Sequence, residues 1–211
     1  VVPPTTKQRE SGGLTKDGDS HASQAIAVET FKNRDIELIK RIPNVKNAYG
    51  AVINQDIVAY KGKTKNTFLF GSNASRFEID KGGLALGRPF TEAEERSLAQ
   101  VAVLGSDIKE YFFGDSDPIG QLVRVGDLNF KVVGVYEPRG SFGFSNDDEQ
   151  VFVPLSTLQK KVLGIDYLFY GIAELVDETK AEFTAEDIRT TLRKSHPRAG
   201  KTASPSPPPF G

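Results

Sequence analysis

The chain has 211 residues, a length that predicts one large domain or two small lobes. Hydrophobic residues make up 38% of it, which is enough to build a core and excludes wholesale disorder. The 27 Lys and Arg residues are balanced by 28 Asp and Glu residues, so the basic excess typical of nucleic-acid binding is absent. There is no cysteine, which excludes disulfides, thiolate metal sites and a cysteine nucleophile.

Methionine is also absent, even at position 1, as expected of a processed product or an excised fragment; removal of an initiator Met before Val1 is the alternative. The apolar runs are shorter than the ~20 residues that cross a bilayer, and no signal-peptide core is visible. Residues 1–19 are polar and rich in Pro and Gly, which predicts a flexible linker. The Pro- and Ser-rich residues 197–211 favour a linker-like tail over a polyproline ligand.

The first predicted element is a helix over residues 33–42. Ile36, Ile39 and Ile42 recur at a three-residue spacing, which gives one apolar stripe. Asp35 lies in the first turn, where a carboxylate suits the positive end of the helix dipole. We expect the helix to end before the proline that follows.

Short apolar runs with glycine-bearing turns predict a series of strands further along the chain: residues 45–60, 67–70, 101–104, 121–125, 129–135, 151–153 and 167–176. The turns at Gly62 and at Gly126 make two hairpins of these strands. Between them we expect helices over residues 107–113 capped by Ser106, over 157–163 capped by Ser156, and from Thr184 onward with Asp187 in a capping box.

The order of these elements predicts an α+β fold with two lobes. Both ends of the folded region mix helix and strand: a helix and a hairpin at the start, and a strand and a helix at the end. The middle is rich in strands. We therefore expect an α/β lobe built from both chain ends, residues 20–80 and 165–196, with a mostly-β lobe inserted over residues 81–164.

Candidate catalytic and metal-binding groups are few. The two histidines, His21 and His196, lie at the edges of the folded region, and no G-x-S-x-G nucleophile motif is present. The acidic run 146–149 has the oxygen ligands that calcium prefers, but its spacing favours a solvated loop. The glutamates at 92, 94 and 95 are expected to form a charge cluster at a helix N-terminus. No catalytic residue, metal site or cofactor is therefore predicted.

Two aromatic residues, Phe142 and Phe144, stand in a polar loop of Gly, Ser, Asn and Asp. Exposed aromatic side chains are unfavourable unless they bind something. Either this pair packs back onto the core, or it offers an apolar contact to a partner or a hydrophobic cargo. We take Phe142 and Phe144 as the candidate contact residues.

A series of short motifs in fixed order resembles a known family. They are Gly87-Arg88-Pro89-Phe90-Thr91, Val101-Ala102-Val103-Leu104-Gly105-Ser106, Phe113-Gly114, Asp117-Pro118-Ile119-Gly120, Phe130-Lys131-Val132-Val133-Gly134-Val135 and Val153-Pro154-Leu155-Ser156-Thr157. Residues 35–45, Phe70-Gly71 and residues 187–196 look like its opening and closing elements. Over residues 14–197 the chain resembles the MacB-like periplasmic core domain of ABC transporter permeases.

The resemblance implies an extracytoplasmic domain between two membrane helices of a permease, with the porter-like lobe and inserted β lobe described above. It implies no catalysis in this chain, with ATP hydrolysed by a separate cytoplasmic domain or subunit. The implied partners are the transmembrane helices, the cytoplasmic ATPase, and an adaptor protein or a hydrophobic or peptide cargo. A dimer is implied for the full transporter, and a monomer for the isolated domain.

Two rival hypotheses remain. The first is a stand-alone envelope module that binds a peptide or lipid through Phe142 and Phe144. The second is an enzyme such as an esterase, which would depend on His196 and a serine. The Pro- and Ser-rich tail departs from the family, in which a short run leads into the next membrane helix.

Overall fold

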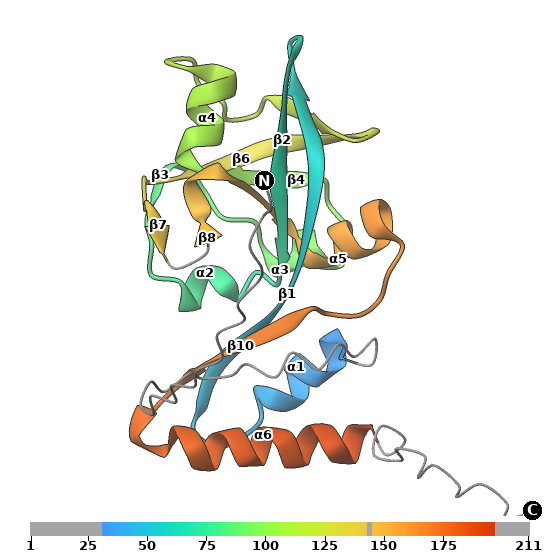
Figure 1. Ribbon diagram of the computed structural model, residues 1–211, viewed down its shortest axis with the longest axis vertical. Coiled ribbons are helices and arrows are strands. Elements are labelled where there is room, and N and C mark those ends of the chain that lie inside the picture. Colours follow the sequence, from blue (N-terminus) through green and yellow to red (C-terminus); the bar gives the residue numbers. More distant parts are fainter. Residues whose placement is uncertain (1–30, 143–144, 197–211) are drawn as a thin grey trace, which may run out of the picture.

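The computed structural model describes residues 31–142 and 145–196, which form two lobes joined by one long strand (Figure 1). This strand, β1 (Val45–Tyr60), pairs through its first half with β10 (Tyr170–Leu175), in the lower lobe of Figure 1. Its second half pairs with β2 (Lys63–Ser72) in the upper lobe. The predicted first hairpin is confirmed, and its first strand is long enough to belong to both lobes.

The lower lobe packs α1 (Asn33–Ile39) and α6 (Ala181–Ser195) against the β1–β10 ribbon (Figure 1). Gly50 of β1 stands directly opposite Gly171 of β10. A Cβ on Gly171 would lie 3.0 Å from Ile36 of α1, and a Cβ on Gly50 would lie 3.2 Å from the same side chain. This glycine pair therefore leaves the flat patch of ribbon on which α1 lies.

The upper lobe is a closed barrel. Its strands follow one another in the ring β1, β2, β9, β4, β6, β5 and back to β1. The strands not yet given bounds are β4 (Val101–Leu104), β5 (Leu122–Val125), β6 (Leu128–Tyr136) and β9 (Gln150–Pro154). The ring closes where Val58 and Ala59 of β1 pair with Val125 and Arg124 of β5. Closure removes the open strand edges that a sheet would otherwise expose.

The barrel is filled by fully buried aliphatic side chains and capped by α4 (Ser106–Phe113). Val58, Leu69 and Val151 are each 0% exposed. The same hydrophobic cluster continues down β1 to the helices of the lower lobe. The two lobes therefore share one hydrophobic core and are not separately packed units.

The remaining elements lie around the barrel and at the junction of the lobes. They are α2 (Arg76–Ile79), β3 (Leu84–Gly87), α3 (Glu92–Arg96), β7 (Ser141–Phe142), β8 (Ser145–Asn146), η1 (Asp147–Glu149), α5 (Leu155–Thr157), which continues as the π-helix η2 (Leu158–Leu163), and η3 (Glu178–Lys180). Strand β3 pairs with the second half of β6, beyond the residues that pair with β5. None of the helices in the described part of the chain is long and apolar enough to cross a membrane.

The predicted α+β class, with a porter-like lobe from both chain ends and a β-rich lobe in the middle, is confirmed by this architecture. The hairpin at Gly126 and the helix that ends at Gly114 are also as predicted. The terminal segments 1–19 and 197–211 lie outside the described residues, so their predicted linker character stays a prediction.

Three predicted helix starts are wrong. The α4 helix begins at Ser106 itself, with Gly105 as its N-cap, and α5 begins at Leu155, directly after Pro154. The α6 helix begins at Ala181, three residues before Thr184, because the short η3 turn leads directly into it. The α1 helix is also shorter than predicted, since it ends at Ile39.

Candidate partner surface

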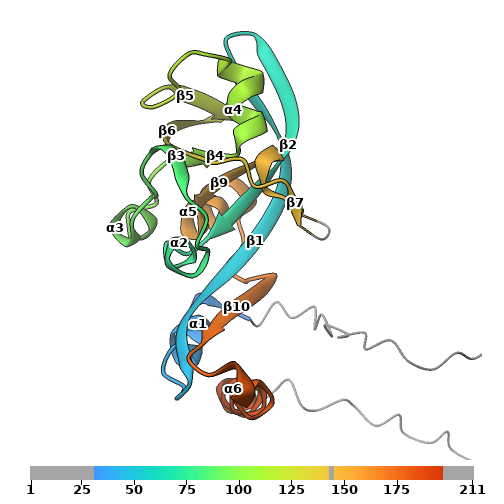
Figure 2. The same ribbon diagram turned by 90° about the vertical axis from the view of Figure 1, so that its left-hand side faces the viewer.

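The two predicted contact residues belong to a small hairpin on the side of the barrel. Strands β7 and β8 pair through Ser141 with Asn146 and through Phe142 with Ser145. Figure 2 shows this hairpin projecting beside β2. The backbone of Phe142 lies in β7, whereas its side chain and the whole of Phe144 lie outside the described residues. Their contact role therefore stays a prediction.

The hairpin is mounted on a cluster of two arginines and two aspartates, which we call the arginine cluster. Arg139 Nη1 lies 2.6 Å from Asp80 Oδ2 and 3.3 Å from Asp147 Oδ2. Arg76 Nη2 lies 3.1 Å and 3.3 Å from the same two oxygens. Asp147 directly follows β8, so these ion pairs fix the base of the hairpin to α2 and its C-cap.

Aromatic rings enclose the two guanidinium groups. Arg76 is only 4% exposed, and its guanidinium carbon lies 4.3 Å from the ring centroid of Phe152. Arg139 stacks at 4.0 Å over Tyr136, whose hydroxyl accepts a hydrogen bond from Arg76. Burial raises the pKa of Tyr136 to about 12, although the nearby arginines favour its ionised form. The buried Arg76, paired, stacked and hydrogen-bonded in this way, connects α2 to the foot of the hairpin.

The acidic run at the foot of the hairpin is not a solvated loop, so that prediction is wrong. Asp148 is 7% exposed and accepts hydrogen bonds from the backbone N–H of Arg139 (2.8 Å) and of Gly140 (2.6 Å). Burial alone would raise its pKa, but these two donors hold the pKa of Asp148 below its ordinary value. The carboxylate thus ties the two ends of the hairpin together.

Two exposed apolar side chains lie on the outer wall of the barrel, as diagonal neighbours on the same face of β1 and β2. Phe68 of β2 is 47% exposed and Ile57 of β1 is 56% exposed. Phe68 pairs in register with Gln150, one residue after the η1 turn, and the Thr67 hydroxyl donates to the Glu149 carbonyl. We call Ile57, Phe68 and the strand pair β7–β8 the hairpin surface. Sequence reasoning missed Ile57 and Phe68, because an outward apolar residue in a strand looks the same as an inward one.

The catalytic groups considered above take structural roles. His196 Nε2 lies 2.9 Å from Asp35 Oδ2, and the Ser195 hydroxyl donates to Asp35 Oδ1 at 3.1 Å. Both groups therefore converge on one carboxylate, unlike a hydrolase site, in which the histidine bridges serine and aspartate. Glu94 forms a capping box with Thr91 at the start of α3, as predicted for that cluster. Within residues 31–142 and 145–196, no group of His, Asp and Glu is placed to hold a metal ion.

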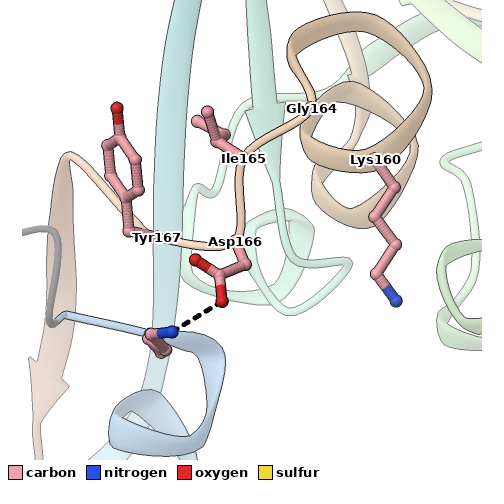
Figure 3. A pocket seen from close by; sticks show the side chains of 6 residues that line it. Lys160, Gly164, Ile165, Asp166 and Tyr167 are labelled. Atoms are coloured by element: carbon pink, nitrogen blue, oxygen red, sulfur yellow. Dashed lines mark hydrogen bonds and ion pairs between the residues drawn. The ribbon is translucent and has the colours of Figure 1, made fainter.

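An open pocket of about 640 Å³ lies where the two lobes meet (Figure 3). It is lined by Lys32, Lys160, Gly164, Ile165, Asp166 and Tyr167. Asp166, labelled in Figure 3, forms an ion pair with Lys32, and their charged atoms are 2.6 Å apart. The wide opening and the few apolar lining groups do not suit a small-molecule site. The pocket is instead a gap beside the chain segment that connects the lobes.

Comparisons with known proteins agree with this geometry. The sequence profile of the MacB-like periplasmic core domain matches residues 4–191. The macrolide export ATP-binding/permease protein MacB of Chlorobaculum tepidum is 31% identical over 187 residues, which cover 88% of this chain and 28% of that protein. The pyoverdine export ATP-binding/permease protein PvdT of Pseudomonas entomophila is 30% identical over 165 residues, covering 77% and 25%. The chain therefore spans about a quarter of the length of these relatives.

Two solved structures share the fold. The periplasmic region of MacB from Actinobacillus actinomycetemcomitans has a TM-score of 0.71 at 20% identity and covers 81% of this chain and 76% of that one. The extracellular domain of the transporter YknZ from Gram-positive bacteria has a TM-score of 0.70 at 21% identity, covering 80% and 86%. With the profile match over most of its length, the chain belongs to the MacB-like periplasmic core domain family.

Proposed function

We propose that this chain is the extracytoplasmic part of an ABC transporter permease that transmits ATP-driven movement and engages a partner. Membership of the MacB-like family and relatives named as ATP-binding/permease export proteins support this assignment. In this proposal the chain itself performs no catalysis. ATP is hydrolysed in the cytoplasm, by a separate domain or subunit, and transmembrane helices join the two sides.

The hairpin surface is the observation that carries the partner role. It combines exposed apolar side chains, Ile57 and Phe68, with a projecting hairpin whose sequence holds Phe142 and Phe144. Aromatic groups on a stiff support bind with little loss of conformational entropy. The arginine cluster supplies that support. The proposed occupant is an adaptor protein or a hydrophobic or peptide cargo, with a dimer as the working transporter and a monomer as the isolated domain.

An export assay with the full-length parent permease tests this role. Replacing both Phe142 and Phe144 with Ser, or Phe68 with Ser, should lower export at least tenfold while ATPase activity and protein level stay unchanged. Phe183→Ser is the matched control, since Phe183 is 79% exposed on α6 of the other lobe. Equal losses from the control, or full export by the hairpin variants, would contradict the proposal.

The rival role, a stand-alone envelope module that binds a peptide or lipid, makes a different prediction. It requires a tight complex between the isolated domain and a small ligand, detectable by native mass spectrometry. The permease proposal expects none, and it expects hydrophobic helices encoded on both sides of this segment in the parent gene. A parent gene without them would overturn it.

A further inference from the structure

The first described residues of the chain contact two distant segments at once. We call residues 31–35 the entry segment and residues 164–169, which lead from the barrel back to β10, the return linker. The entry segment holds the C-terminal end of α6 on one side and the return linker on the other. These contacts lie between residues more than 130 positions apart in sequence.

The contact with the C-terminal end is made by one buried carboxylate. Asp35 is 0% exposed and accepts hydrogen bonds from the Lys32 backbone N–H at 2.8 Å and from the Ser195 hydroxyl at 3.1 Å. His196, the residue directly after α6, places Nε2 2.9 Å from the same carboxylate. A buried carboxylate is costly without its donors, so these hydrogen bonds tie the first turn of α1 to the end of α6.

The contact with the return linker uses the residues just before Asp35. The Leu168 backbone N–H donates to the Phe31 carbonyl at 2.7 Å, and Lys32 pairs with Asp166 at 2.6 Å (Figure 3). The Leu168 side chain is 3% exposed and packs so close to β1 that a Cβ on Gly50 would lie 2.5 Å from it. The linker is therefore seated in the lower lobe.

The return linker is also attached to the barrel. Gln159, in the π-helix η2, donates from Nε2 to the Tyr167 carbonyl at 2.7 Å, and its own carbonyl accepts from Ile165 N–H at 3.0 Å. A displacement of the linker therefore reaches η2 through direct hydrogen bonds.

We propose that the entry segment is a coupling junction, which passes a displacement of either chain end to the return linker and so to the barrel lobe. Both ends of the described chain meet at Asp35, and the linker is bound by the adjacent residues. The role in transport rests on the proposed function, in which membrane segments move these ends. The coupling itself is a property of the isolated domain and is tested there.

Amide hydrogen exchange in the isolated domain tests the coupling. Removing the two side-chain donors from α6, by Ser195→Ala with His196→Ala, should speed exchange of the Leu168 amide at least tenfold. Barrel amides such as Val132 should keep their rates. The control is Arg193→Ala, a change at a residue of the same helix that is 74% exposed. Unchanged exchange at Leu168, or equal acceleration in the barrel, would overturn the junction.

A charge exchange in the full-length permease tests its use in transport. Lys32 and Asp166 are 35% and 71% exposed, and exposed ion pairs add little to folding, so single variants keep the fold. Lys32→Asp or Asp166→Lys alone should lower export severalfold at constant ATPase activity, and the double variant should restore it. Export unaffected by either single variant would overturn the transport role of the junction, while the hairpin variants still test the proposed function separately.

Discussion

Glu94 is a residue whose ionisation is tied to local structure. Its carboxylate accepts two hydrogen bonds from Arg88, at 2.8 and 2.9 Å, and one from the Thr91 backbone N–H at 2.9 Å. The arginine, first among these groups, lowers the pKa of Glu94 from 4.5 to about 2. These bonds join the start of α3 to the Gly87-Arg88-Pro89 stretch of the family motif, so the predicted N-terminal charge cluster also connects α3 to a neighbouring segment.

The stabilisation by Glu94 should therefore depend on pH. Its pKa is lower in the folded chain than in the unfolded one, so its contribution is present above about pH 4.5 and is lost as the pH falls toward 2. Arg88 is 52% exposed, which limits the effect to about 1 kcal/mol. Urea unfolding of wild type and Glu94→Gln should differ at pH 7 and converge near pH 2. A gap that is constant with pH would contradict this account.

Gly105, in the Val101–Ser106 motif, lies too close to the backbone of η1 to carry a side chain. A Cβ there would lie 2.3 Å from the Asp147 carbonyl oxygen and 2.4 Å from that of Asp148. Gly105→Ala should therefore push η1 away and cost about 2 kcal/mol, seen as a lower melting temperature. The control is Gly62→Ala, with φ at +80° and open space around it, which should cost about 1 kcal/mol. Equal losses in both variants would remove the close-approach explanation.

At the scale of elements, signals from neighbouring residues predicted most of the turns and strands. Glycine turns after alternating apolar residues located both hairpins, at Gly62 and at Gly126. The start of α6 was misplaced because Thr184 and Asp187 match a capping box in sequence. In the structure the Thr184 hydroxyl instead donates to the Lys180 carbonyl and accepts from Asn44 in the lower lobe. The contact with Asn44 thus sets the role of Thr184, which its sequence pattern had placed at the N-terminus of the helix.

The apolar stripe of α1 makes a quantitative prediction. Ile36 is 1% exposed and sits on the patch left by Gly50 and Gly171, so Ile36→Ala removes packed atoms and leaves a cavity. The expected loss is about 3 kcal/mol in the free energy of unfolding, measured with urea. Ile57→Ala removes the same atoms from a side chain that is 56% exposed and should cost less than about 0.5 kcal/mol. Similar losses at both positions would contradict the packing of α1 on the ribbon.

At the scale of the whole molecule, the sequence predicted the two lobes but not how they are joined. The barrel closes through only two residue pairs between β1 and β5, and no short-range pattern marks such a contact. The same holds for the Asp35–His196 pair, whose members are 161 residues apart, and for Arg76 and Asp147, which are 71 apart. Asp35 was predicted only to face the helix dipole, because burial by the other end of the chain cannot be seen from its neighbours.

Barrel closure has a consequence for the division into domains by sequence. The stretch 81–164 contains β4, β5, β6 and β9 but lacks β1 and β2, which complete the ring. Alone, it would leave β5 and β9 with open edges and expose the 0%-exposed side chains of Val123 and Val151.

We therefore expect a fragment of residues 81–164 to be unfolded or aggregated, with fast amide exchange throughout. A fragment of residues 45–164 restores β1 and β2 and should regain cooperative unfolding and slow exchange in β4 and β6. The two fragments differ only in the first hairpin and α2 with its flanking loops, so the comparison isolates what these residues supply. Cooperative unfolding of the shorter fragment would mean that the inserted lobe folds by itself and does not need β1 and β2 to complete its core.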